Sequence, residues 1–463
     1  MLNNQILNKK GVCLLWKIKG KFHFQRFLSQ NIDRHYDIII AGGGMVGTTL
    51  ACTLGKNSIL KNKKILLLEA GKEKPWTLPE KYNNRVVSVN PGSQKLLSSI
   101  NAWNFIEKNR VATVKQLQVW EALSDASITF EQPKNNEPIS YIVENDLILA
   151  AVAEQAQSCP NLEIQYEAKV KNYQLPDFNA DITQLKMENG QNFSCNLLLG
   201  CDGVNSTVRK CMHANYISWN YGQMGVVATL QLDQQPGFKN DVAWQRFLPN
   251  GPVALLPLTD ELSSLVWSTT IQQAKELLEL PEERFVEQLN KAIGGTFKKS
   301  SLVSQAINSF DNLLRALNCP STNQATAPTI CGMETNSRAA FPLGFGHSSQ
   351  YIGKGVVLVG DAAHRIHPLA GQGVNLGFGD VNCLNEVLTK AVYSGGGLND
   401  LSYLKEYESE RQKHNLPMMI AVEGLHRLTT TTLAPIVLLR GLGLQFSNAL
   451  VPLKKYLISQ ASI

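Results

Sequence analysis

This sequence of 463 residues lacks the features of a secreted, metal-binding or membrane-spanning protein. Its nine cysteines include no C-x-x-C pair, which argues against a disulfide scaffold, a zinc ribbon or a thioredoxin-like site and fits a reducing compartment. No run of about 18 apolar residues occurs, so we expect no membrane-spanning helix. The sequence shows no Ser/His/Asp triad, thiol pair or acid–base dyad, which favours chemistry carried by a cofactor.

Acidic residues are missing from residues 1–32, which carry six basic residues among apolar ones. This composition predicts a mitochondrial transit peptide over residues 1–32, with a processing region near Arg26-Phe27-Leu28-Ser29. The alternative is a disordered basic tail. Without this leader the chain holds 38 basic and 38 acidic residues, so the formal charge of +6 lies in the leader. The charge therefore gives no reason to expect nucleic acid as a partner.

A glycine-rich turn follows the first strong strand signal, at residues 36–41. In the turn, Gly42 suits a tight bend, Gly44 permits a pyrophosphate to approach the backbone, and Gly47 permits close packing of helix and strand. The next predicted strand, residues 64–69, ends in Glu69, which is placed to bind ribose hydroxyls. This pattern predicts a Rossmann-type site for FAD or NAD, and both cofactors remain open at this point.

A second strand–turn–helix stretch runs from Gly355 to Asp380. Residues 356–359 predict a buried strand, and Gly360 and Asp361 follow it directly. The loop after them ends in residues 371–376, where a new helix is expected to begin. Asp361 is suited to accept hydrogen bonds from sugar hydroxyls, and the amides of residues 371–375 are suited to face a ring that gains negative charge.

These residues carry a resemblance to a known family. The run from Gly360 to His364, followed by Pro368 and by Gly371-Gln372-Gly373-Val374-Asn375, resembles the second FAD motif of single-component aromatic hydroxylases. The order of the motifs is more narrowly similar to the ubiquinone-biosynthesis hydroxylases, in particular the mitochondrial ring C5-hydroxylases. The resemblance implies FAD as cofactor, held by both ends of the chain. It also implies that Pro368, Leu369, Gly371 and Gln372 lie near the reacting ring.

Further cofactor contacts are implied by the same resemblance. Arg85 is expected beside the flavin, although a surface arginine capping a strand would look the same in sequence. Asn145 is expected near the ribityl chain, at the start of a helix that Asn145 or Asp146 caps. Asp202 and Gly203 belong to the family's middle motif, with Arg209 pairing with Asp202 or orienting the turn. Cys201 stands where the family commonly has alanine, a mild departure.

The implied activity is insertion of one oxygen atom from O2 into a polyprenyl-hydroxybenzoate or polyprenylphenol ring. Ferredoxin and its reductase are the expected electron donors, with NAD(P)H as the alternative. Other ubiquinone-biosynthesis proteins and peripheral contact with the matrix side of the inner membrane are also implied. Two competing interpretations are a prenyl-lipid reductase or epoxidase, and a catalytically silent flavin-fold subunit. Product analysis and FAD retention, respectively, separate these from a hydroxylase.

The predicted fold is an α/β protein in which a Rossmann-type FAD-binding domain is interleaved with an antiparallel β-sheet substrate domain, followed by C-terminal helices. We expect FAD-binding segments at 33–112, 141–212 and 346–425, substrate segments at 113–140 and 213–345, and a C-terminal helical region at 426–463. Residues 297–331 look like a polar insertion that is ordered only in part, and residues 401–416 like a charged helix. The C-terminal region suits either a membrane surface or packing on the body.

Two smaller predictions concern side chains. The aromatic and apolar residues of the predicted substrate sheet are more often core than substrate wall; they are Trp244, Phe247, Leu255 and Trp267. His364 and His367 have a spacing that would suit a metal, but no further ligand accompanies them, so we expect no metal site.

Overall fold

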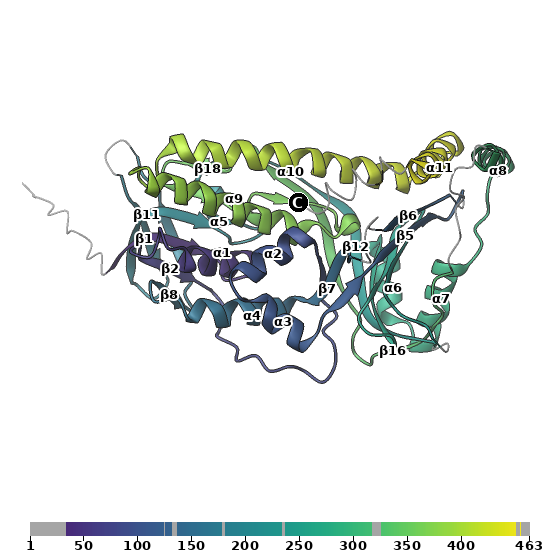
Figure 1. The fold of residues 1–463 in the computed structure, drawn as a ribbon, viewed down its shortest axis with the longest axis horizontal. Helices are drawn as coiled ribbons and strands as arrows, with labels where there is room; N and C mark the ends of the chain where they lie inside the picture. The colour runs from purple at the N-terminus through teal and green to yellow at the C-terminus, as the bar shows by residue number, and fades with distance from the viewer. Residues whose placement is uncertain are drawn as a thin grey trace, which may run out of the picture.

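The computed structural model describes residues 34–124, 126–131, 137–177, 181–233, 237–316, 326–450 and 454. The predicted transit peptide, residues 1–32, lies outside these residues. Figure 1 shows an elongated molecule in which one long helix, α10 (Leu401–Thr430), runs beside both of the large β-sheets.

The first sheet is a mostly parallel one of eight strands, built from three separate parts of the chain. Its central path is β18-β19-β11-β1-β2-β8, where only β18 runs antiparallel, and β10 and β9 extend antiparallel from β11. The central strands carry buried apolar runs, which suit strands covered on both faces; the runs are residues 38–41, 65–68, 197–199 and 356–358. The eight strands are β1 (Arg34–Ala41), β2 (Ile65–Leu68), β8 (Leu162–Gln165), β9 (Val170–Gln174), β10 (Thr183–Met187), β11 (Asn192–Gly200), β18 (Ile352–Gly353) and β19 (Val356–Leu358).

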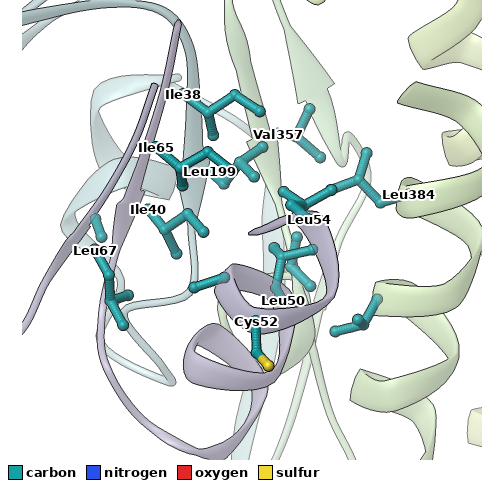
Figure 2. Packing of buried hydrophobic residues seen from close by; sticks show 14 of the residues in the cluster. Ile38, Ile40, Leu50, Cys52, Leu54, Ile65, Leu67, Leu199, Val357 and Leu384 are labelled. Atoms are coloured by element: carbon teal, nitrogen blue, oxygen red, sulfur yellow. The ribbon is translucent and has the colours of Figure 1, made fainter. Parts of the chain in front are cut away.

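Helices from distant parts of the chain pack on this sheet and on one another. In Figure 2, Leu50 and Leu54 lie between the strands that carry Ile38 and Val357 and the helix that carries Leu384. All of these side chains are buried in one apolar core. The helices of this half are α1 (Met45–Lys56), α2 (Pro91–Ser99), α3 (Trp103–Asn109), α4 (Asn145–Gln157), α5 (Thr207–Cys211) and α9 (Gly373–Tyr393).

The second sheet has nine strands and forms the other half of the molecule. Its path is β20-β17-β12-β15-β14-β13-β5-β6, with β16 on β12, and every neighbouring pair is antiparallel except β5 and β13. β20 lies within the segment predicted for the FAD-binding domain, yet it pairs with β17. The strands are β5 (Gln116–Glu121), β6 (Ser127–Glu131), β12 (Tyr216–Leu232), β13 (Val242–Leu248), β14 (Gly251–Pro257), β15 (Leu262–Thr270), β16 (Ile330–Met333), β17 (Ala339–Ser348) and β20 (His364–Arg365).

The two faces of the second sheet have different roles, because successive side chains of a strand point to opposite sides. On one face, Trp244, Leu255 and Trp267 belong to a core that the helices α6 (Ile271–Glu279) and α7 (Glu282–Gly294) complete. On the other face, Phe247 clusters with Leu369. Of the four candidates, only Phe247 therefore lies toward the FAD-binding half.

A smaller antiparallel sheet has three strands in the order β3-β7-β4. Two short 3-10 turns follow β19 of the first sheet and β20 of the second. Along the chain, α2 and α3 lie between β3 and β4, and α4 follows β7. The three strands are β3 (Val86–Val89), β4 (Ala112–Val114) and β7 (Ser140–Glu144), and the 3-10 turns are η1 (Gly360–Ala362) and η2 (Pro368–Ala370).

The C-terminal helices depart from the sequence-based expectation in two places. The helix predicted to end at Leu416 is the long helix of Figure 1, α10 (Leu401–Thr430), which continues through Pro417. A proline removes one N–H from a helix, but packing of residues such as Met419 and Val422 holds this one together. The predicted polar insertion contains a regular helix, α8 (Ser301–Ala316), which packs on α11 (Ala434–Ala449) through Val303, Ile307 and Val437. The interleaved α/β fold itself is as predicted.

Candidate active site

Four strands of the first sheet end in one row. Ala41 of β1 is in register with Gly200 of β11 and Leu68 of β2, and Gly200 is in register with Leu358 of β19. Gly42, Glu69, Asp202 and Asp361, four of the residues predicted to bind a cofactor, follow these ends within three residues. Ligands of open α/β sheets bind at the carboxyl ends of the strands, so this row is the candidate site.

The three motif glycines after β1 have different local environments. Gly42 has a φ of +108°, and a Cβ there would lie 2.4 Å from the carbonyl oxygen of Cys201. A Cβ on Gly47 would lie 1.9 Å from the carbonyl oxygen of Gly42. A Cβ on Gly44 would meet no heavy atom within 4 Å. Gly42 and Gly47 are thus required by the fold, whereas the space over Gly44, at the N-terminus of α1, is open to a phosphate group.

Glu69 lies beside the glycine turn and is held in place by backbone amides. The N–H of Gly43 donates to its Oε2 at 2.7 Å, and the N–H of Gly71 donates to its Oε1 at 2.6 Å. Both carboxylate oxygens keep capacity for a further donor, because each accepts more than one hydrogen bond. Sugar hydroxyls can therefore reach a preoriented acid.

The middle motif links two of the strand ends. Asp202 Oδ2 accepts from the N–H and Oγ1 of Thr207, at 2.6 Å and 2.9 Å, while its buried Oδ1 has no partner among the described residues. Gly203 has a φ of +76° and open space beside it. Arg209 is buried and donates to the carbonyls of Val204 and Ala362, each at 2.7 Å. Of the two predicted roles, these bonds favour orientation of the turn over pairing with Asp202.

The turn after β19 carries the second acid and is fixed by a buried carboxylate. Gly360 has a φ of +62°, and its N–H donates to Asp380 Oδ2 at 2.9 Å. Asp361, the next residue, is exposed in the turn just beyond the end of β19. Asp380 also binds His364 at 2.6 Å and Arg411 Nε at 2.7 Å. Burial raises the pKa of Asp380, but His364 and Arg411 outweigh this and hold the pKa well below its usual range.

The loop that enters α9 presents backbone amides. Gly371 has a φ of +61°, Gln372 precedes the helix, and Gly373 is its first residue, where a Cβ would meet no heavy atom within 4 Å. Val374 is partly buried against the core of the first sheet. Asn375 is buried and fully used within the protein, since its Oδ1 accepts from the N–H of Asn90 and from Ser93 Oγ. The first amides of α9 lack partners within the helix and carry its positive end.

Arg85 and Asn145 lie next to each other at the start of α4. The N–H of Asn145 donates to the carbonyl of Arg85 at 3.0 Å. The side chain of Arg85 is exposed. The helix α4 begins at Asn145, so Glu144, and not Asn145 or Asp146 as predicted, occupies the capping position. The buried Oδ1 of Asn145 has no partner in the part of the chain that the structure describes.

Pro368 and Leu369 form the short turn before Gly371. Pro368 is half-buried, whereas Leu369 is buried in a cluster with Phe247 and Val422, which come from the second sheet and from α10. This turn is therefore the point at which the cofactor edge of the first sheet meets the second sheet.

The site fits FAD. Open space over Gly44 suits a diphosphate, while Glu69 and Asp361 offer carboxylates to hydroxyl groups at separate strand ends. The orphaned oxygens of Asn145 and Asp202 are buried acceptors, which native proteins rarely leave unpaired without a ligand or water. A long cofactor with several donor groups satisfies them.

Comparison with known proteins identifies the family. A family model described as FAD binding domain matches residues 35–311 and 322–419. Ubiquinone biosynthesis monooxygenase COQ6, mitochondrial, of Drosophila melanogaster is 50% identical over 422 residues, which cover 91% of this chain and 88% of the relative. The chain belongs to this ubiquinone biosynthesis monooxygenase family. The Homo sapiens member is 42% identical over 447 residues, covering 95% of both chains.

Solved structures agree with the fold. The p-nitrophenol 4-monooxygenase PnpA of Pseudomonas putida superposes with a TM-score of 0.67 at 16% identity, covering 93% of this chain and 98% of that one. HpxO of Klebsiella pneumoniae in complex with FAD gives a TM-score of 0.66 at 15% identity, covering 92% and 98%. The predicted family, the FAD cofactor and the monooxygenase activity are thereby confirmed for this member of the ubiquinone biosynthesis monooxygenases.

Sequence reasoning missed two parts of the site. Asp380 has a sequence signal, because it is the one acid on the mostly apolar buried face of α9. His426 of α10 has no sequence signal, because only the fold brings it close to His367. The centroids of the two rings lie 4.6 Å apart. His364 and His367 do not act as a pair, because His364 binds Asp380 while His367 accepts from the N–H of Leu369. No group of three or more candidate metal ligands occurs among the described residues.

Proposed function

We propose that the chain inserts one oxygen atom from O2 at ring carbon 5 of a polyprenyl-hydroxybenzoate or polyprenylphenol in ubiquinone biosynthesis. The observation that supports this most directly is the apolar cluster that contains both Leu369 and Phe247. It brings the cofactor edge of the first sheet against an apolar face of the second, where an aromatic ring can lie. The names of the relatives supply the pathway.

The residues of the chain have definable tasks in such a reaction. Bound FAD supplies the electrons that activate O2. We assign FAD contacts to the predicted residues at the strand ends and in the α9 loop, described above. The amides of residues 373–375 stabilise negative charge on a ring placed before them, because they carry the positive end of α9. Leu369, Phe247 and Val119 exclude water from the apolar side.

The proposed electron donors are ferredoxin and its reductase, with NAD(P)H as the alternative. The test is anaerobic reduction of the FAD-loaded protein by each donor, followed through the loss of flavin absorbance. Reduction by NAD(P)H alone, at a rate equal to that with ferredoxin, would contradict the first choice.

We also propose peripheral contact with the matrix side of the mitochondrial inner membrane. An ordinary surface helix buries apolar side chains and exposes polar ones, but α11 does the reverse at several positions. It buries Arg440, Gln445 and Asn448, and it exposes Leu439 (66%) and Phe446 (52%). Among the described residues, no helix is both long and apolar enough to cross a membrane.

Neighbouring helices enlarge this apolar surface. Leu302 and Leu313 of α8 are exposed, and α8 packs on α11 (Figure 1). Ile420 of α10 is 62% exposed. On the inner side, Leu444 of α11 packs against the cluster that contains Leu369. Apolar side chains thus continue from the helices that we place on the membrane to the turn of Pro368 and Leu369 at the proposed flavin site. This arrangement suits a substrate with a polyprenyl tail.

The membrane contact is tested by sedimentation with vesicles of phosphatidylcholine containing an anionic phospholipid. We expect Leu439→Glu combined with Phe446→Glu to lower the bound fraction at least tenfold, because two exposed apolar anchors are lost. A matched control is Tyr393→Glu, since Tyr393 is exposed at the end of α9 and outside this surface. Equal binding by the double variant and wild type would contradict the proposal.

The reaction itself is tested on the chain from residue 33 to 463. Flavin absorbance that disappears in Gly44→Asp and Asp361→Ala would support FAD at the proposed residues. Incubation with a short-tailed prenylphenol, reduced ferredoxin and isotopically labelled O2 should then give a product with one labelled oxygen. A product with added hydrogen instead would indicate a reductase, and a chain that cannot be loaded with FAD would indicate a silent subunit.

A further inference from the structure

Three aromatic side chains from distant elements meet next to the turn of Pro368 and Leu369, which we place beside the flavin. They are Tyr221 of β12, His367 at the end of the β20–η2 connection, and His426 of α10. The ring centroids lie 5.1 Å apart for Tyr221 and His367, 4.5 Å for Tyr221 and His426, and 4.6 Å for the two histidines. His367 is 0% exposed and His426 is 8% exposed.

Hydrogen bonds decide which nitrogen of His367 carries its proton. The N–H of Leu369 donates to His367 Nδ1 at 3.1 Å, so this nitrogen has no proton. Burial, and then the neighbouring His426, lower the pKa of His367 to about 3, so the ring is neutral at physiological pH. The proton therefore lies on Nε2. This buried N–H has no partner in the described part of the chain.

Hydrogen bonds also show which ring nitrogen of His426 carries its proton. The Gln223 amide donates through Nε2 to the carbonyl of Asn250 at 3.0 Å, which places its Oε1 toward His426. This oxygen lies 2.9 Å from His426 Nε2, which must therefore be the donor. His426 Nδ1 is consequently a bare acceptor, and it too is buried without a partner among the described residues.

Tyr221 does not satisfy either atom. Its hydroxyl donates to Glu423 at 2.6 Å, and Glu423 is held by Arg427. Two adjoining buried rings thus present one unpaired donor and one unpaired acceptor. Native structures rarely leave such atoms unpaired, so the pair indicates a missing ligand.

A hydroxyl group matches this pair, because it accepts one hydrogen bond and donates another. A carboxylate only accepts, and an ammonium only donates. His367 also immediately precedes Pro368 and Leu369, the turn that we place beside the flavin. We propose that His367 and His426 bind the aromatic hydroxyl of the substrate, with His367 Nε2–H donating to its oxygen and His426 Nδ1 accepting its hydrogen.

This inference rests on the proposed function, since it names the substrate group that the site recognises. The hydroxyl of a phenol directs substitution to the neighbouring and opposite ring carbons, and a hydrogen bond donated by the hydroxyl raises the electron density of the ring. The two histidines would therefore orient the ring together, and the hydrogen bond accepted by His426 would activate it. A bound water molecule has the same hydrogen-bonding capacity, and the experiment below separates the two.

The test compares a short-tailed prenylphenol with its O-methyl ether on the FAD-loaded full chain, and measures Kd from the change in flavin fluorescence. The ether accepts a hydrogen bond but donates none. We expect wild type to bind the phenol about tenfold more tightly than the ether, as one hydrogen bond implies. His426→Leu should weaken phenol binding about tenfold and leave ether binding within twofold, so that the discrimination disappears.

His367→Asn gives an independent test, because the asparagine oxygen keeps an acceptor for the N–H of Leu369. This variant lacks the Nε2–H donor, so it should weaken binding of both the phenol and the ether. His414→Leu, on the same helix as His426, is the matched control and should behave as wild type. FAD content shows that each variant is folded.

The outcomes separate this inference from the proposed function. Wild type that retains FAD but binds neither compound refutes the proposed substrate class. Wild type that hydroxylates the phenol, together with unchanged discrimination in His426→Leu, refutes the histidine pair alone and indicates a structural water. An equal loss for phenol and ether in His426→Leu also refutes it, because a structural role of His426 would explain that result.

Discussion

Asp380 is the residue whose replacement should most clearly separate packing from charge. It is completely buried and accepts hydrogen bonds from the N–H of Gly360, from His364, and from Arg411. In Asp380→Asn the side chain keeps its size, but the charge disappears. Its new NH2 group must also face one of these donors. The variant thus leaves the buried Arg411 without a counter-charge.

The expected loss of stability follows from that unpaired cation. Removing one partner of a buried ion pair costs about 3–5 kcal/mol. A domain is stable by about 5–15 kcal/mol, so this is a large share of the free energy of unfolding. FAD binding should also weaken, since the N–H of Gly360 fixes the turn that carries Asp361. Because the pKa of Asp380 lies well below its usual range, the contribution is constant near neutral pH and is lost only as pH falls below about 4.

The assay is urea denaturation of the FAD-free protein, together with titration by FAD. Glu386→Gln is the matched control, because it removes an exposed carboxylate from the same helix and should change stability by less than about 0.5 kcal/mol. Asp380→Asn combined with Arg411→Met should be more stable than Asp380→Asn alone, because the unpaired cation is gone. A loss below about 1 kcal/mol in Asp380→Asn would refute the reasoning.

Three further predictions concern glycine, proline and histidine positions. Gly44→Ala should weaken FAD binding at least tenfold in a titration, because the new Cβ enters only the space assigned to the diphosphate. The same variant should leave the urea midpoint of unfolding unchanged. Gly47→Ala should instead unfold the protein, because its Cβ clashes with the carbonyl oxygen of Gly42. Pro417→Ala should raise stability by about 1–3 kcal/mol in calorimetry, because a proline inside a helix removes a hydrogen bond, and no gain would show that the helix is already adapted to it. His367 has its pKa lowered to about 3, so the unfolded chain binds a proton between that value and about 6.5, and stability falls as pH decreases through this range. His367→Asn should remove about 1.5 kcal/mol of the loss between about pH 6.5 and pH 5, and an identical pH slope in urea denaturation of both proteins would contradict this.

The parts of the fold that sequence could predict are those with a local signal. The strand before Gly42, the glycine turn and the acid at Glu69 follow one another within a single βαβ unit, so their order alone predicts their geometry. The alternation of β13 likewise predicts two faces. It does not say which face meets a helix, and Trp244 and Phe247 could be assigned only once α7 and α10 were placed.

The parts that sequence could not predict depend on contacts between distant segments. Pro417 marks a helix end by local rules, yet packing carries α10 past it. The polar composition of residues 297–331 favoured a partly ordered insertion, but Val303 and Ile307 of α8 lie on one face of a regular helix and pack with Val437 of α11. His426 joins His367 only because α10 crosses the second sheet. The predicted cofactor contacts remain predictions until FAD binding is measured on their variants.

The two hydrogen bonds of Arg209 also bear on how the chain matures. Its guanidinium joins the carbonyl of Val204 to that of Ala362, a residue that a ribosome adds much later. Before β19 and Ala362 are made, the nascent chain already has the glycine turn, Glu69 and Asp202. Arg209 then lacks its acceptor on Ala362, and β11 lacks its neighbour β19. The incomplete chain is therefore expected to retain no flavin. Yellow colour would then report that a molecule is complete through α9, which makes flavin retention a simple screen for truncated products.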